Sequence, residues 1–203
     1  MAEPTPLLKP VAPAQSPARL WTHDQFVFDH WRRLDDAAPV ERASRPLLSL
    51  ARWRREGAAL RQRGQRIGLA LETGETLDRS SDDPSGLAVI ALVLGKFTDG
   101  RVYSTARHLR EDWGYAGEIR ATGDVLLDQI PLMLRAGIDA FEITDAATIR
   151  ALERGHLPAV SRVYQRGVDA VPRPWRERRA GEFAAASADP TRSGHAHEAH
   201  ERA

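Results

Sequence analysis

The sequence AVIALVLGKFTDGRVYS, residues 88–104, joins the most apolar run of the chain to a polar turn. The run from Ala88 to Leu94 is apolar at every position, which is typical of a parallel strand buried on both faces. The turn carries charged and hydroxyl side chains, and an amphipathic helix follows it. Strand-to-helix turns commonly hold the functional site of α/β proteins, because helix N-terminal N–H groups converge there. The stretch therefore predicts an α/β fold and the place of a candidate site.

The same pattern of strand, polar turn and helix is repeated along the chain. We expect strands at 67–71, 89–97, 117–122 and 140–143, and helices at 104–113, 125–135 and from Thr144 or Asp145 to about Gly155. Strands that alternate with helices through short connections predict a small parallel sheet with right-handed crossovers. Two arrangements of this α/β sheet stay open, a partial (β/α) barrel and an open three-layer sheet. The repeated helix starts that carry Arg and Asp slightly favour the partial barrel.

Two further elements are expected before the repeated units. The aromatic stretch 21–31 predicts a short strand or hairpin, and a helix at 47–63 has Ser49 as a candidate N-cap. Within the helix at 125–135, Pro131 should weaken or kink the helix, because proline lacks an N–H group and crowds the preceding turn.

The two ends of the chain differ in composition from the middle. Residues 1–19 contain five prolines, and residues 177–203 are rich in His, Ala and Arg. This predicts a disordered arm and a disordered tail on either side of a single α/β domain at 20–176. Four parallel strands would leave the sheet edges exposed, so a homodimer that covers them is one expected assembly.

Composition limits the classes of protein to which the chain can belong. The 29 Lys and Arg residues against 28 Asp and Glu residues give a net charge of +1, which indicates neither a nucleic-acid partner nor an anionic membrane. The chain has no cysteine, which excludes disulfides, thiolate nucleophiles and cysteine-held zinc or iron–sulfur centres.

The sequence also lacks the common cofactor and metal motifs, membrane-spanning runs and secretion signals. The chain has no G-x-x-x-x-G-K-[ST], G-x-G-x-x-G or H-E-x-x-H motif, so we expect no cofactor and no metal. No apolar run approaches the roughly 20 residues that span a bilayer. No basic segment followed by an apolar one opens the sequence, which predicts a cytoplasmic protein.

A candidate site follows from the parallel topology, because the carboxyl ends of parallel strands share one edge of the sheet. The predicted ligand-binding residues are Lys96, Thr98, Asp99, Gly100, Arg101, Tyr103, Ser104, Arg107, Arg120, Gly123, Asp124 and Glu142. Lys96 and Arg101 would bind a phosphate, sulfate or carboxylate. Asp99 or Asp124 would act as a base or orient Arg101, which makes Asp99, Arg101 and Asp124 the candidate catalytic residues.

Several of these residues also have a structural interpretation. Asp-Gly, here at 99–100, is a common turn dipeptide, and Ser104 and Asp124 are of the types that cap helices. Arg120 and Glu142 could form an ion pair between neighbouring strands. The residues alone leave both interpretations open.

Three motifs resemble the signature of the bacterial domain-of-unknown-function 934 family. They read KFTDGRVYSTARHLR at 96–110, GYAGEIRATGDVLLDQ at 114–129 and GIDAFE at 137–142. Weaker similarity extends from the predicted helix, at 47–53, to Tyr164 and Gln165, and the resemblance covers roughly 20–172 in all. The family commonly has a cysteine where this chain has Ala136, which weakens any family mechanism that needs a thiol.

The resemblance implies a pathway context. Members of the family tend to be encoded beside sulfite reductase and adenylyl-sulfate reductases of assimilatory sulfur metabolism. This implies an accessory protein of sulfate and sulfite reduction, with sulfite reductase or its electron donor as partner. The alternative is a small enzyme or binding module that acts on a sulfur oxyanion or a phosphorylated metabolite.

Overall fold

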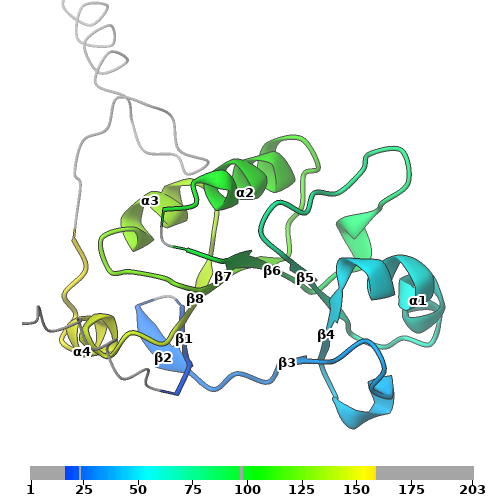
Figure 1. Cartoon of the computed structure of the whole chain (residues 1–203), viewed down its shortest axis with the longest axis horizontal. Helices are drawn as coiled ribbons and strands as arrows, with labels where there is room; N and C mark the ends of the chain where they lie inside the picture. Colours follow the sequence, from blue (N-terminus) through cyan, green and yellow to red (C-terminus); the bar gives the residue numbers. More distant parts are fainter. Residues whose placement is uncertain (1–16, 23, 97, 159–203) are drawn as a thin grey trace, which may run out of the picture. The chain divides into compact units, whose positions relative to one another are not determined.

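The computed structural model describes residues 17–22, 24–96 and 98–158 (Figure 1). These described residues form one compact unit. The predicted arm, apart from its last three residues, and the predicted tail at 177–203 lie outside the described residues.

Eight strands form one sheet in the order β2-β1-β8-β7-β6-β5-β4-β3. Their bounds are β1 Arg19–Thr22, β2 Gln25–Val27, β3 Arg32–Arg33, β4 Pro46–Ser49, β5 Gly68–Leu71, β6 Val89–Leu94, β7 Glu118–Gly123 and β8 Ala140–Ile143. Strands β3 to β8 run parallel to one another. Strands β1 and β2 form an antiparallel hairpin, and β1 pairs with β8 in the antiparallel direction. The predicted α/β class is confirmed, as is the hairpin in the aromatic stretch.

The sheet curls into a half-barrel whose helices lie along its outer face (Figure 1). The helices are α1 Leu50–Gln62, α2 Arg101–Glu111, α3 Ile130–Arg135 and α4 Ala146–Glu153, and two short 3₁₀ turns span Val40–Arg42 and Pro84–Gly86. This is the partial-barrel arrangement. The sheet ends in the short strands β2 and β3 rather than in long parallel edges, and short edge strands resist edge-to-edge pairing.

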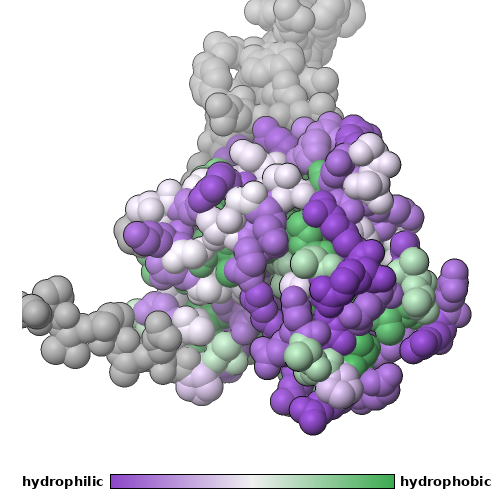
Figure 2. Space-filling model, turned by 45° about the vertical axis from the view of Figure 1, so that its right-hand side comes forward, coloured by the Kyte–Doolittle hydropathy of each residue, from purple (hydrophilic) through white to green (hydrophobic). Residues whose placement is uncertain are grey.

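The core follows from the alternation of side chains along each strand. On β6, Ile90 and Leu92 face the helices and belong to the main core cluster. Val89 and Ala91 face the concave side, where they pack with Leu47 and Trp31. The face shown in Figure 2 is mostly hydrophilic, with small hydrophobic areas between polar side chains. None of the described helices has the length and apolarity that crossing a membrane requires.

Three predicted helix starts need correction or refinement. The predicted helix at 47–63 begins with strand β4, and α1 starts at Leu50. Its N-cap is Ser49, as predicted, because Ser49 Oγ accepts a hydrogen bond from the N–H of Arg52 at 3.1 Å. Helix α2 begins three residues before Ser104, at Arg101, so Ser104 is not its N-cap.

The third start concerns Pro131. Helix α3 begins at Ile130, so Pro131 lies in its first turn and neither kinks nor interrupts it. A first-turn N–H has no partner within the helix, and the loss of that N–H therefore costs little. The expected helix over 125–135 is wrong in its first half, where the chain forms turns.

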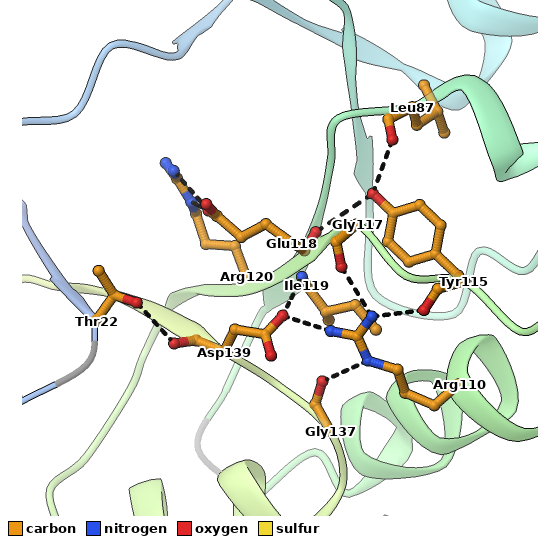
Figure 3. A network of polar contacts seen from close by, with 10 residues as sticks. All are labelled: Thr22, Leu87, Arg110, Tyr115, Gly117, Glu118, Ile119, Arg120, Gly137 and Asp139. Atoms are coloured by element: carbon orange, nitrogen blue, oxygen red, sulfur yellow. Dashed lines mark hydrogen bonds and ion pairs between the residues drawn. The ribbon is translucent and has the colours of Figure 1, made fainter.

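Arg110 ties α2 to the turns that precede β7 and β8 (Figure 3). Its guanidinium donates to the carbonyl oxygens of Tyr115, Gly117 and Gly137 at 2.6, 2.8 and 3.0 Å and pairs with the carboxylate of Asp139. That carboxylate also accepts from the N–H of Ile119 at 2.9 Å. These contacts hold the C-terminal end of α2 in place and so determine where its other end lies.

Candidate functional site

A shallow hollow lies where β6 ends and α2 begins. Its volume is about 530 Å³, and the residues around it are Thr73, Gly95, Lys96, Thr98, Asp99, Gly100 and Arg101. The structure therefore brings together five of the predicted ligand-binding residues, all from the turn after β6. We call this the edge hollow.

Thr73 is a part of the edge hollow that sequence reasoning missed. It comes from the loop after β5, the neighbouring strand of the sheet. Its hydroxyl donates to the carbonyl oxygen of Val93 at 2.9 Å and accepts from the N–H of Gly95 at 3.0 Å. Thr73 thereby joins the ends of β5 and β6. Its only signal in the sequence was its place two residues after the end of a predicted strand.

Asp99 and Arg101 form a closely matched pair beside the first turn of α2. One carboxylate oxygen of Asp99 accepts from the backbone N–H and Nε of Arg101 at 3.1 and 2.9 Å, and the other accepts from Nη2 at 2.7 Å. These hydrogen bonds hold the pKa of Asp99 below its usual value. A carboxylate held ionised by a guanidinium is a weak proton acceptor, so the geometry suits orientation of Arg101 better than general base catalysis.

Gly123 has a backbone role at the same edge. Its φ angle is +96°, and a Cβ atom built on it would collide with the carbonyl oxygen of Leu94. The ends of β6 and β7 approach each other closely here, and the N–H of Asp124 lies 3.4 Å from the same oxygen. Asp124 is not a helix cap, because α3 starts only at Ile130 with Gln129 as N-cap.

Three predicted residues lie farther along α2 and do not border the edge hollow. Tyr103 packs against the core, and its burial raises the pKa of its hydroxyl, with a smaller effect from Asp128. Ser104 borders a different hollow on α2. Arg107 is exposed, and its Nε atom lies 3.9 Å from Oε1 of Glu111.

Arg120 lies on the concave face, and its side chain is only 1% exposed. It donates to Glu118 at 2.9 Å on its own strand and to Asp29 at 2.6 Å. Asp29 belongs to residues 28–31, between β2 and β3, and it also accepts from the N–H of Trp31 at 2.9 Å. A buried arginine is thus neutralised partly by a segment far away in the sequence.

The predicted ion pair between Arg120 and Glu142 is wrong. The register of β7 and β8 places Arg120 opposite Ala140, so Glu142 lies two residues farther along its strand. In the described part of the chain, the Glu142 carboxyl makes neither a hydrogen bond nor an ion pair. Burial raises its pKa, and the charge of Asp29 adds to this effect, whereas Arg120 and Arg33 oppose it.

Glu142 should make stability depend on pH. The folded protein keeps this proton to a higher pH than the unfolded chain, so the free energy of unfolding falls as pH rises upward from the ordinary value of 4.5. Glu142→Gln cannot ionise and should unfold like the parent below pH 4.5 but be the more stable protein at pH 7. Urea denaturation at both pH values measures this, with the exposed Glu41→Gln as control. If the variant and the parent differed by the same free energy of unfolding at both pH values, the prediction would be contradicted.

The described residues include no group of three or more His, Asp or Glu side chains placed to hold a metal ion. The candidate site thus has two parts: the mixed-charge edge hollow, and the ionic cluster of Arg120, Glu118 and Asp29 on the concave face.

A search among curated proteins finds no match to the chain. A family model described as a bacterial protein of unknown function, DUF934, matches residues 68–175. Because this match covers more than half of the 203 residues, the chain belongs to the DUF934 family.

Proposed function

We propose that this protein is a cytoplasmic accessory protein of assimilatory sulfate and sulfite reduction. It acts with sulfite reductase or the electron donor of that enzyme, and it binds an anionic group at the edge hollow. The pathway is the one that the family resemblance implies. The observation that carries the binding role is the pair of cations, Lys96 and Arg101, around an open hollow.

The charges of the edge hollow favour an anion. Lys96 and Arg101 provide two positive charges against the single carboxylate of Asp99. The Lys96 side chain is exposed and makes no ion pair within the described residues. A guanidinium has five N–H groups, and Asp99 takes only the Nε group and one on Nη2. Arg101 can therefore keep its hold on Asp99 and still donate to a ligand.

The openness of the hollow favours an accessory role. The Arg101 side chain is 65% exposed, whereas redox reactions and acyl transfers generally use sites that exclude water. An exposed cationic edge suits an acidic side chain of a partner protein. The chain also lacks cysteine, so it carries no electrons on a thiolate-held centre.

Growth of a deletion strain tests the pathway. We expect the strain to fail on sulfate and on sulfite as sole sulfur source and to grow on sulfide or cysteine. This pattern would place the defect at sulfite reduction. Growth on sulfite as good as that of the parent strain would contradict the proposal.

A double variant tests the edge hollow. We expect Lys96→Ala with Arg101→Ala to lose complementation on sulfate, because the hollow then has no cation. Both side chains are exposed, so stability should change by less than about 1 kcal/mol. Arg63→Ala is the matched control, an exposed arginine at the end of α1 that does not border the edge hollow. Full complementation by the double variant would exclude a role for the hollow.

The second candidate is a small enzyme or binding module that acts on a sulfur oxyanion or a phosphorylated metabolite. Asp99, Arg101 and Asp124 would then belong to its catalytic site. One observation favours it, namely that Glu142 is a half-buried carboxyl near two arginines and is able to hold a proton. Calorimetric titration of the purified protein with sulfite and with phosphate separates the two. Binding by the protein alone favours this candidate, and co-purification of sulfite reductase without such binding favours the accessory role.

A further inference from the structure

Four arginines lie together where the neighbouring strands β3, β4 and β5 begin (Figure 1). Arg32 opens β3, Arg45 directly precedes β4, and Arg66 lies two residues before β5. Arg42 ends the 3₁₀ turn that leads into β4. Parallel strands begin at one edge of a sheet and end at the other, so these residues lie at the opposite edge from the edge hollow. We call the four residues the arginine edge.

The pairing of the three strands brings these arginines close together. The N–H of Arg32 donates to the carbonyl oxygen of Arg45 at 3.0 Å. Leu47 of β4 is paired with Gly68 of β5, so Arg45 and Arg66, each two residues earlier, lie at the same level of adjoining strands. Neighbouring strands are about 5 Å apart, so the three strand starts lie within a width of about 10 Å. The arginine edge therefore concentrates positive charge on a small part of the molecule.

The side chains of the arginine edge differ from those of nearby arginines in having no partner. Within the described residues, none of the four makes a side-chain hydrogen bond or an ion pair. Arg45 is partly buried, and the other three are exposed. The other arginines of residues 32–62 each pair with a carboxylate: Arg33 with Glu72, Arg52 and Arg55 with Glu56, Arg54 with Asp82, and Arg61 with Asp83. The fold thus neutralises its other arginines here and leaves the charge of the arginine edge available to a partner.

We propose that the arginine edge is a docking surface for an acidic segment of a partner protein. A guanidinium matches a carboxylate through two parallel hydrogen bonds, and neighbouring unpaired guanidiniums repel one another until such groups arrive. A nucleic acid fits less well, because the net charge of +1 gives the chain no broad positive field for a phosphate backbone. This surface goes beyond the proposed function and does not depend on it, because none of its residues borders the edge hollow.

Binding of an acidic peptide by the full-length protein tests the proposal. The probe is a fluorescein-labelled glutamate oligomer, and its binding is followed by fluorescence anisotropy. We expect saturable binding that weakens as salt is added, and weaker binding of an oligothymidylate of the same charge. Tighter binding of the oligothymidylate would overturn the proposal and assign the surface to a nucleic acid. Absence of saturable peptide binding would also overturn it.

Reversal of charge locates the binding. Arg45→Glu with Arg66→Glu should weaken peptide binding at least about tenfold, because like charges then face each other. Arg150→Glu with Arg154→Glu is the matched control, since it reverses two exposed arginines in α4 and at its end. The control lowers the net charge by the same amount and should change the affinity less than about threefold. Equal weakening by the two variants would show that binding follows net charge alone, and the proposal would be wrong.

Two further variants keep the test decisive. Arg32→Glu with Arg42→Glu changes only exposed side chains, so it decides the outcome if circular dichroism shows that the first pair does not fold. We expect it to weaken peptide binding about tenfold as well. Lys96→Ala with Arg101→Ala, in the edge hollow, should weaken peptide binding less than either arginine-edge variant does. The reverse order would overturn the proposal and assign the acidic peptide to the edge hollow.

Discussion

Replacing Arg110 with alanine is expected to lower the free energy of unfolding by about 3–5 kcal/mol. The Arg110 side chain is only 14% exposed, and it donates to three carbonyl oxygens as well as to Asp139. Without it, the Asp139 carboxylate loses its cation, and all three carbonyl groups lose a donor in partly buried positions. Urea denaturation followed by circular dichroism measures the loss.

The lysine variant separates the charge of Arg110 from its shape. Arg110→Lys keeps one positive charge, but an ammonium on a flexible stem cannot donate in four directions fixed by a planar fork. We expect it to recover less than half of the loss. Arg107→Ala, one helical turn earlier and exposed, should cost less than about 1 kcal/mol. A loss below about 1 kcal/mol for Arg110→Ala would show that the network around this side chain contributes little.

The strands and helices that sequence reasoning found are those with a strong apolar signal. Strand β8 was predicted at its observed bounds. Strand β6 was predicted from its continuous apolar run, but it ends at Leu94, three residues before the predicted end. The strands β3 and β4 have two and four residues, and β4 merges directly into α1, so neither shows a period of its own. Short elements of this kind are defined by their neighbours in the sheet rather than by their own residues.

The residues of the candidate site also differ in whether the sequence could predict them. The edge hollow is built mainly from one contiguous turn, so its residues could be named from the sequence. Thr73 and Asp29 could not, because each reaches the site through the pairing of strands or through a connection far away in the chain. The partner of Arg120 depended on the register of β7 and β8, and a pair of charged residues in two strands does not determine that register.

Gly123→Ala is expected to destabilise the protein by about 3 kcal/mol or more. Two costs add at this position. Its φ angle of +96° is strained for any residue with a Cβ atom, and the added methyl group would meet the backbone oxygen of Leu94. A backbone oxygen cannot swing away like the end of a side chain, so β6 and β7 would have to separate. The measurement is again urea denaturation, at a pH where the parent protein unfolds reversibly.

Gly114→Ala is the matched control, because its φ angle of +61° carries conformational strain but no atom lies within 4 Å of the added Cβ. It should cost about 1–2 kcal/mol, the conformational cost alone. The difference between the two variants therefore measures the close approach of β6 and β7. Equal losses would show that the strands adjust freely there. In that case Gly123 would not be needed for the packing of these two strands.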